Sequence, residues 1–519
     1  MRVNPLHKIV AASVLVLALY ASSGFAQTSK GSIGGTVTDS SDSVIVGASV
    51  TAKNNDTGEL RRTTTGSNGQ YRLDAAEPGS YAVTFTESGF APLILDKITV
   101  AGSVVTSVNA KLTVSGTRQT VVVESTNAAV QTENGAISQA IGSAEIQEIP
   151  FDSLDPYVLA ATLPGVSTVT SGLYNFTNDT NGTAYASNGE RARANNFLIE
   201  GQDNNDAYIH GQGLQPENIE AIREVTVLLN STSAEYGHGG GAIVNLIYQS
   251  GTNSFHGAAW ERLSNSSLDA KDPASPDSKF RENIFGFDVG GPLKKDRLFF
   301  FASYQWDDYR SSATGGNLVL PSAAGHDVLE QYASNNPQNQ RIAAMLAAYG
   351  NLRGDPTRSG SPAPIPLGID PATGMDRGSV EMGLFNRTGV PLQYNQPEFD
   401  AKGDYLITKN DTLNLRYIRS SFSTPYDFFN YPNNLPGFDS DQSGIWHNAG
   451  ITYTHIFAPT LLNEVRVSYG RMGLSFLPRA DNVPAPTWKP SPLPEFRGGA
   501  RMRQFPRAAS TTLTRCRTR

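Results

Sequence analysis

Two short segments combine residue types and spacings that could support chemistry. The His-Gly-Gly-Gly run at 238–241 could let backbone N–H groups approach a substrate oxygen, but the chain has no Gly-x-Ser-x-Gly turn to supply a nucleophile. Glu200, Asp203 and Asp206 could serve as calcium ligands, but they lack the alternation and closing glutamate of a calcium loop. We therefore interpret the glycines as a tight turn before a strand at 242–248, and the acidic residues as turn and hydrogen-bonding groups.

The sequence gives no support for an enzyme. It lacks a His-Glu-x-x-His zinc motif, a Walker phosphate-binding loop and a Gly-x-Gly-x-x-Gly nucleotide-binding turn. Its single cysteine, Cys516, excludes an internal disulfide framework and a cysteine-based zinc cluster. We expect no catalytic residue, no cofactor and no metal site, so binding or transport is the function class that remains.

Residues 1–26 have the features of an export signal. A basic start precedes an apolar run from Ile9 to Tyr20, and the segment Gly24-Phe25-Ala26, with small residues at 24 and 26, predicts cleavage before Gln27. No segment of the chain offers the roughly 20 uninterrupted apolar residues that a membrane-spanning helix needs. Any membrane-spanning part must therefore be built from β-strands.

Composition favours a mostly β chain with long polar loops. Only 39% of the residues are hydrophobic, while 49 are Gly and 30 are Pro, a profile that suits short strands separated by turns. A chain of 519 residues allows about three domains.

The net charge of −7 is distributed unevenly along the chain. Residues 478–519 carry eight Arg and one Lys against Asp481 and Glu495, a local balance of +7. This basic, Pro-rich tail has no strand-like alternation. We interpret it as a frameshifted or foreign reading frame, with a natural disordered extension as the alternative, and we expect no nucleic-acid partner.

Residues 27–116 predict a small β-sandwich, because short β-rich segments alternate evenly with turn residues. The defining motifs are Gly35-Thr36-Val37-Thr38-Asp39, Asn54-Asn55-Asp56-Thr57-Gly58, Gly69-Gln70-Tyr71, Pro78-Gly79-Ser80-Tyr81 and Gly89-Phe90. On these residues the segment resembles the carboxypeptidase regulatory-like domain, which implies an Ig/transthyretin-like fold of the kind also found in carbohydrate-binding modules. Sugar binding is the functional reading that this fold invites. However, Tyr71, Tyr81 and Phe85 alternate as core residues and form no evident stacking platform.

Residues 137–252 carry the most specific set of motifs. These are Glu148-Ile149-Pro150, Leu163-Pro164-Gly165-Val166, Asn188-Gly189-Glu190-Arg191, Glu200-Gly201-Gln202-Asp203, Pro216-Glu217-Asn218-Ile219-Glu220 and Ala234-Glu235-Tyr236-Gly237. Together they resemble the plug of Oar-like TonB-dependent outer-membrane receptors, which implies an α+β plug domain. Two departures concern plug loops: the family usually has Asp-Gly where this chain has Glu200-Gly201, and an Arg where this chain has Phe151-Asp152-Ser153.

The linker at 117–136 contains a compact β-branched stretch, Thr120, Val121, Val122, Val123 and Glu124. It resembles a TonB box, the short extended segment that pairs edge-on with a strand of the periplasmic protein TonB in that family. The alternative is that Thr120 to Val123 form the last strand of the sandwich, since β-branched runs are common in strands.

Residues 253–477 predict an antiparallel transmembrane β-barrel, of which only part is present. Seven segments alternate in hydrophobicity, as expected for strands with one face toward lipid and one toward the lumen; they are 254–263, 280–291, 298–309, 396–408, 411–420, 446–457 and 461–473. Arg416, Glu464 and Arg466 fall on the lumen side. We expect a water-filled lumen to accommodate these charges without the cost of burial in a dry core.

The connections between these segments alternate strictly between short and long. The short ones are 292–297, 409–410 and 458–460, and the long ones are 264–279, 310–395 and 421–445. Outer-membrane barrels have short periplasmic turns and long external loops, so the long connections are predicted to face the exterior. The resemblance implies a barrel of about 22 strands, and we therefore interpret the chain as C-terminally truncated.

The resemblance implies transport across the outer membrane. The expected partners are TonB with its inner-membrane energising complex, outer-membrane lipid and an unidentified external ligand, for which a glycan is one candidate. A different function class remains open, a surface or periplasmic carbohydrate-binding protein acting through the sandwich. A third reading, a carboxypeptidase-associated enzyme, is opposed by the missing metal-ligand motif.

Overall fold

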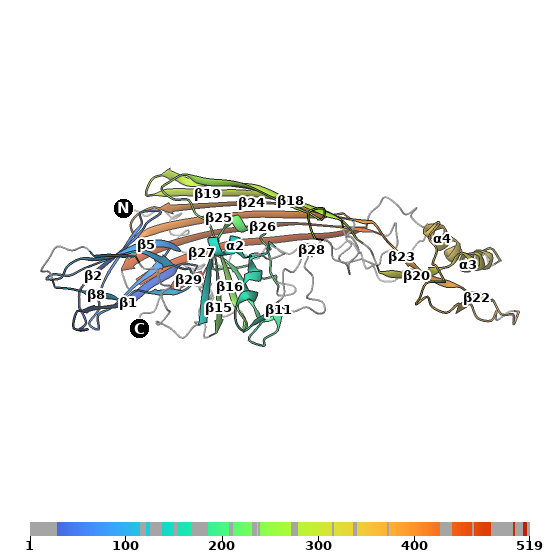
Figure 1. The fold of residues 1–519 in the computed structure, drawn as a ribbon, viewed down its shortest axis with the longest axis horizontal. Coiled ribbons are helices and arrows are strands. Elements are labelled where there is room, and N and C mark those ends of the chain that lie inside the picture. Colours follow the sequence, from blue (N-terminus) through green and yellow to red (C-terminus); the bar gives the residue numbers. More distant parts are fainter. Residues whose placement is uncertain are drawn as a thin grey trace, which may run out of the picture.

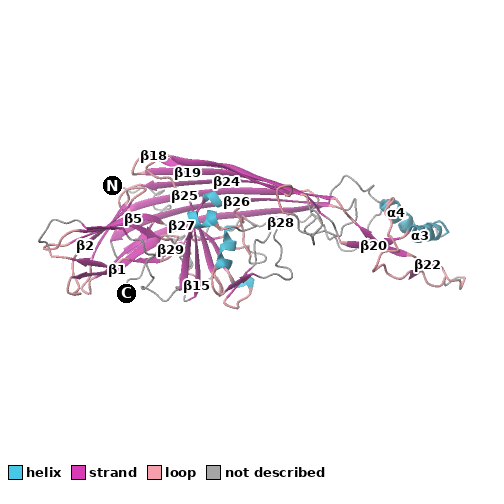
Figure 2. Ribbon diagram, in the orientation of Figure 1, coloured by secondary structure: helices cyan, strands magenta, loops and turns pink. Residues whose placement is uncertain are grey.

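The structure is a computed structural model, and it confirms a mostly β fold (Figure 2). It describes residues 29–114, 121–124, 137–149, 154–168, 185–206, 211–230, 236, 239–270, 279–313, 316–335, 340–370, 373–425, 439–458, 461–478, 502–503 and 512–515. The expected export signal at 1–26 lies outside these residues. Within the described ranges, no helix combines the length and apolar character needed to cross a membrane.

The N-terminal unit is a two-sheet β-sandwich. One sheet has the order β4-β1-β7, with β8 also paired to β1, and the other has the order β3-β2-β5-β6-β9. Tyr71, Tyr81 and Phe85 lie in the core between the sheets, as the alternating pattern predicts. The strands are β1 (Gly31–Asp39), β2 (Ser49–Asn54), β3 (Leu60–Thr64), β4 (Gln70–Ala76), β5 (Gly79–Thr86), β6 (Leu93–Val100), β7 (Val105–Ser107), β8 (Ala110–Leu112) and β9 (Val121–Glu124).

The plug contains a five-stranded mixed sheet of order β10-β15-β16-β13-β14, flanked by short helices. Its inner strands β13 and β16 are buried along their whole length, as expected for strands covered on both faces. The elements are β10 (Ile137–Gly142), α2 (Ser143–Glu148), the 3-10 helices η1 (Pro156–Thr162), η2 (Ala192–Ala194) and η3 (Ile219–Ala221), β11 (Val166–Thr168), β12 (Tyr185–Ser187), β13 (Asn196–Ile199), β14 (Gln202–Asp203), β15 (Ile222–Asn230) and β16 (Ile243–Tyr248).

Seven long antiparallel strands form one curved sheet, one in each of the seven predicted segments. Most run several residues farther toward the long connections than predicted. Short strands β28 (Met502–Arg503) and β29 (Thr512–Arg515), in a tail for which the sequence predicts no strands, pair with the last long strand. The long strands are β17 (His256–Asn265), β18 (Phe280–Lys294), β19 (Leu298–Ala313), β24 (Val390–Leu406), β25 (Asp411–Thr424), β26 (Ser440–Ala458) and β27 (Leu461–Pro478).

The connection between β19 and β24 is folded, whereas the sequence suggests only a long polar loop. Two helices and two small antiparallel pairs of strands occupy it, because the sequence there includes an apolar helical run around Met345. The elements are β20 (Asn317–Pro321), α3 (Ala323–Asn335), α4 (Gln340–Tyr349), β21 (Ile365–Pro366), β22 (Ser379–Val380) and β23 (Met382–Asn386).

The units are arranged along the barrel strands (Figure 1). The sandwich lies at one end of the long sheet, the plug lies against the concave side of the sheet, and the α3–α4 module lies at the far end. The short turns sit at the sandwich end, where Lys30 of the sandwich donates hydrogen bonds to Thr412 and Thr454 of the barrel. The plug core continues into the barrel, because Phe301, Ile418 and other barrel side chains belong to the same buried cluster.

Candidate functional site between the plug and the barrel

A tight plug hairpin, β13–β14, lies at the centre of the contact with the barrel. Ile199 pairs with Gln202 across the two-residue turn formed by Glu200 and Gly201. Both turn residues have positive φ, 49° for Glu200 and 69° for Gly201. Such turns favour Asn-Gly or Asp-Gly, and a glutamate in this left-handed conformation costs about 1 kcal/mol. The strained glutamate therefore requires a compensating interaction.

The Glu200 carboxylate supplies that interaction. Its Oε1 lies 2.5 Å from Nζ of Lys402 on β24 and accepts a hydrogen bond from the Tyr248 backbone N–H at 3.3 Å. Its Oε2 lies 3.9 Å from Nη1 of Arg416 on β25. An aspartate at this position has a side chain one methylene shorter. The departure from the family's Asp-Gly thus coincides with a buried ion pair between plug and barrel.

Two barrel arginines bind the backbone of the same hairpin. Arg416 donates hydrogen bonds to the Ile199 carbonyl at 2.7 Å and to Gln202 Oε1 at 2.8 Å. Arg466 on β27 donates to the Gly201 carbonyl at 3.2 Å and forms an ion pair with Glu464. The expected water-filled lumen is wrong at this level, because the plug hairpin fills the space and leaves these charges buried.

A second contact, formed by plug residues Glu217 and Asn218, reverses the charge arrangement. Here the carboxylates belong to the barrel: the backbone N–H groups of Glu217 and Asn218 donate to Glu398 at 3.2 and 3.3 Å. The Asn218 side chain donates to Ser303 Oγ at 2.7 Å and to Asp400 Oδ2 at 3.0 Å. The Pro-Glu-Asn motif seen in the sequence therefore donates hydrogen bonds to buried barrel carboxylates from neutral groups, its backbone N–H groups and the Asn218 side-chain amide.

A third contact joins the sandwich to the barrel. Lys30 pairs with Glu77 at 2.8 Å while also binding Thr412 and Thr454 of the barrel. Burial alone would raise the pKa of Glu77, but the positive charges of Lys30 and Lys402 outweigh it and lower this pKa to about 2. An ionised carboxylate of the sandwich thus pairs with Lys30, the side chain that binds the barrel.

The sandwich also binds the plug through hydrogen bonds. The Gly102 backbone N–H donates to Glu224 Oε1 at 2.9 Å, Thr226 Oγ1 donates to the Gly102 carbonyl at 3.2 Å, and Asn245 donates to Ser103 Oγ at 3.0 Å. Burial raises the pKa of Glu224. These bonds hold the loop between β6 and β7 against the plug sheet.

The TonB-box-like stretch forms an edge strand of the sandwich. Residues 121–124 make up β9, which runs parallel to β6 with Leu93 opposite Val121 and Asp96 opposite Glu124. This is the arrangement of the alternative reading, a last sandwich strand; Thr120 lies outside the described residues. In the described chain β9 has β6 as its one neighbour in the sheet, and no other described strand pairs with its second edge.

The two segments considered as possible sites of chemistry, 238–241 and the acidic residues Glu200, Asp203 and Asp206, make structural contacts. A Cβ at Gly239 would come within 2.2 Å of the Ala194 carbonyl oxygen, so this glycine allows two backbone segments to approach closely; His238 lies outside the described residues. Glu200 is committed to Lys402, and Asp203 accepts a hydrogen bond from the Asn205 backbone N–H at 2.9 Å. Asp206 donates its backbone N–H to the Gly211 carbonyl at 2.8 Å.

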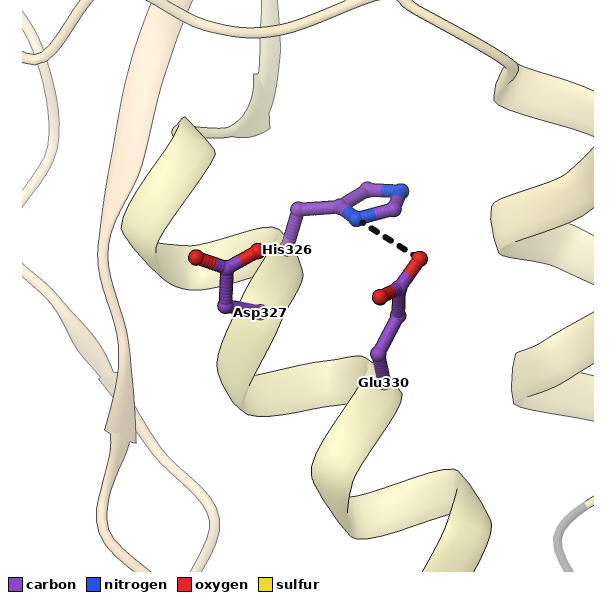
Figure 3. Close-up of side chains that lie close together, drawn as sticks. All are labelled: His326, Asp327 and Glu330. Carbon is purple, nitrogen blue, oxygen red and sulfur yellow. Dashed lines mark ion pairs between the residues drawn. The ribbon is translucent and has the colours of Figure 1, made fainter.

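One cluster in the described residues has the side chains of a metal site, where the sequence predicts none. His326, Asp327 and Glu330 on α3 each offer a ligand atom, all within 4.8 Å of one another (Figure 3). His326 Nδ1 lies 3.3 Å from Glu330 Oε1, the usual spacing of an i, i+4 pair on a helix. Asp327 and Glu330 are exposed, and His326 Nδ1 already faces Glu330.

Some of the contacts between the units could hardly be predicted from the sequence. Lys402 could have been found from its position, because it lies on the same face of its strand as Glu398 and Asp400, facing inward. The contact of Lys30 with Thr412 and Thr454 has no local signal, since it forms only when the sandwich meets the barrel.

Comparisons with known proteins agree with this architecture. A family model for an outer membrane beta barrel domain matches residues 247–512, and one for a carboxypeptidase regulatory-like domain matches residues 32–113. The TonB-dependent transporter Oar of Myxococcus xanthus is 26% identical over 309 residues, which cover 55% of this chain and 27% of that protein. The chain therefore spans about a quarter of the length of this curated relative.

Solved structures are similar at a lower level. The outer membrane transporter YddB from Escherichia coli is 12% identical, with a TM-score of 0.41 over 65% of this chain and 39% of that chain. The siderophore receptor PirA from Acinetobacter baumannii is 16% identical, with a TM-score of 0.41 over 68% and 42%.

The carbohydrate-binding alternative is not favoured, because Tyr71, Tyr81 and Phe85 of the sandwich are buried and the curated relative is a transporter. The family match indicates the outer membrane as the location. The chain also has a carboxypeptidase regulatory-like domain and is similar to Oar. It therefore belongs to the outer membrane beta barrel domain family and is an Oar-like homologue of the TonB-dependent transporters.

Proposed function

We propose that this chain acts in TonB-dependent uptake of an external substrate through the outer membrane, after export by a cleaved signal peptide. The observation that carries the proposal is the plug hairpin at Glu200, which occupies the concave side of the barrel sheet and is held there by Lys402, Arg416 and Arg466. A substrate can pass only when these contacts rearrange. The proposed role is transport and not catalysis.

TonB is the partner that the edge strand β9 fits. A strand with one open edge can bind a further strand through main-chain hydrogen bonds. Because β9 has four residues and pairs only with β6 in the described chain, it presents such an edge at the periplasmic end. Pulling on β9 would act on the sandwich, and through Lys30 and Gly102 on the barrel and plug.

A proline substitution tests this role. Val122→Pro removes one backbone donor and disrupts the extended pairing, so we expect capture of the full chain by the periplasmic domain of TonB to weaken about tenfold or more. Val122→Thr keeps the N–H and the β-branched shape and should bind as the wild type does. If Val122→Pro bound TonB normally, β9 would be only the last strand of the sandwich.

A further inference from the structure

Three neighbouring strands of the long sheet carry a cluster of basic side chains, which we call the outer basic cluster. It consists of Arg419 on β25, His447 on β26 and Arg471 on β27. Arg419 is paired with His447 in the strand register, and His447 is paired with Arg471. Side chains at such positions have Cβ atoms about 5 Å apart. Two guanidinium groups therefore flank one imidazole on a single patch of the sheet.

The outer basic cluster lies on the face of the sheet that points away from the plug. Successive side chains of a strand point to opposite faces. Ile418, Trp446 and Met472 each adjoin a member of the cluster in sequence, and all three lie in or against the core shared with the plug. The plug occupies the concave side of the sheet (Figure 1). The cluster therefore lies on the convex side, which faces lipid in a barrel.

The position of the cluster along the strands places it near the external boundary of the membrane. Arg419 is nine residues from the turn residue Asn410, and His447 and Arg471 are eleven and ten residues from the strand ends Ala458 and Leu461. Ten residues of a strand that rises about 3.4 Å per residue and is tilted by about 40° span about 25 Å along the membrane normal. The apolar band of an outer-membrane barrel is also about 25 Å tall.

The outward residues on either side of the cluster agree with this depth. Toward the short turns, the two nearest rows are apolar or aromatic; they are Leu415, Ile451 and Val467, and Tyr417, Ala449 and Tyr469. In the opposite direction, the second row consists of Ser423, Ser443 and Ser475. The cluster thus lies where the acyl chains of the outer leaflet end and the headgroups begin.

The positive charge of the cluster has no compensating carboxylate in the described chain. Arg419 and Arg471 are exposed, and neither has an ion pair among the described residues. Like charges on adjacent strands repel each other, and charged side chains on a lipid-facing surface are destabilising. An anionic group supplied by the membrane would offset both effects.

The donor groups of the cluster suit a phosphate. Guanidinium groups bind phosphate oxygens through paired N–H···O hydrogen bonds. Tyr417 Oη lies 2.9 Å from His447 Nδ1. When the tyrosine hydroxyl donates to Nδ1, the ring proton is on Nε2, which then offers a third N–H donor beside the two guanidinium groups.

The surroundings of the cluster favour a phosphate that is carried on acyl chains. The same row of the sheet continues through β24, β19 and β18 with the aromatic residues Phe399, Tyr304 and Phe287. The basic cluster is therefore a local patch bordered by aromatic side chains on one edge and by apolar side chains on the turn side. A free phosphate ion would gain nothing from these neighbours, whereas a lipid would contact them.

We propose that Arg419, His447 and Arg471 bind a phosphate group of lipid A, the phosphorylated glycolipid of the outer leaflet, and that its acyl chains lie along the apolar rows toward the short turns. The bound lipid would neutralise the cluster and fix the depth of this part of the sheet in the membrane. The inference uses the orientation in which the short turns are periplasmic, and it does not depend on β9 or on TonB.

Native mass spectrometry of the detergent-solubilised full chain tests the site, with bisphosphorylated lipid A, the same lipid without its phosphates, and inorganic phosphate as probes. A basic side chain at an anionic lipid surface contributes about a factor of five in affinity. The Arg419→Ala/Arg471→Ala double variant should therefore bind bisphosphorylated lipid A about 25-fold more weakly than the wild type. Both arginines are exposed, so folding should be unaffected.

Arg281→Ala/Arg310→Ala is the matched control. These two arginines are also exposed and paired across neighbouring strands, β18 and β19, but they lie farther toward the long connections, and Arg310 Nε is 3.1 Å from Asp308 Oδ1. This control should bind bisphosphorylated lipid A as the wild type does, and the lipid without phosphates should bind the wild type more weakly.

Three results would overturn the proposal. Equal losses in the two double variants would show general charge attraction. Equal binding of the lipid with and without phosphates would show that the acyl chains alone are recognised. Displacement of the lipid by equimolar inorganic phosphate would show a site for the free ion.

Discussion

The two plug–barrel contacts both bury charged groups, but the carboxylate belongs to the plug in one and to the barrel in the other. At the β13–β14 hairpin, one plug carboxylate, Glu200, faces barrel cations on two strands, Lys402 on β24 and Arg416 on β25. At Asn218, buried barrel carboxylates face neutral plug donors. Losing the plug side of the first contact leaves buried Lys402 and Arg416 without their Glu200 carboxylate, whereas losing the second leaves acceptors that lack a neutral donor. The first contact should therefore resist plug movement more strongly than the second.

The difference also concerns backbone strain. Glu200 holds a positive φ that a glutamate rarely adopts, and observed strain of this kind is typical of functional positions. Asn218 has no such strain; its φ is −84°. A contact that combines strain with buried charge can have two well-separated states, which is what the proposed transport role would use.

Glu200→Gln should have the largest effect. The glutamine keeps the size of the side chain but leaves Lys402 and Arg416 without their carboxylate, and breaking a buried ion pair costs about 3–5 kcal/mol. The measurement is the free energy of unfolding of the full chain in urea and detergent. Glu148→Gln, on the exposed face of α2, is the control, and an equal effect of the two variants would contradict the importance of the hairpin ion pair.

Glu77→Gln extends the comparison to the sandwich, and its effect on the free energy of unfolding should depend on pH. The folded pKa of Glu77 is about 2, below its ordinary value of 4.5, so its stabilisation is present above pH 4.5 and is lost as the pH falls toward 2. The variant should lose about 2–3 kcal/mol near neutral pH. Urea unfolding of both proteins across this pH range checks it; a difference that stayed constant at all pH values would show that the Glu77 charge is not involved.

Asn218→Ala should have the smallest effect of the three. It removes the donor to Ser303 and Asp400 and should lower the free energy of unfolding by about 2 kcal/mol. Asn230→Ala, at the exposed end of β15, should change it by less than about 0.5 kcal/mol. A loss at Asn218 as large as that at Glu200 would remove the proposed ranking of the two contacts.

The strand pattern of the barrel could be predicted well from the sequence, and the long connection could not. Alternation of Leu413, Leu415 and Tyr417 with polar neighbours is a local property, and it correctly separates the outer from the inner face of β25. The α3–α4 module was missed because Pro, Gly and Asn around it dominate the composition of residues 310–395.

The sequence by itself determined the fold class, the order of the units and the inward position of Arg416, Glu464 and Arg466, because these follow from periodicity and motifs within short segments. Only the tertiary structure decided what those charges face. The pairing of Glu200 with Lys402 joins residues about 200 positions apart, and that of Lys30 with Thr454 joins residues more than 400 apart. No local pattern encodes such contacts, because they arise only when plug, sandwich and barrel pack together.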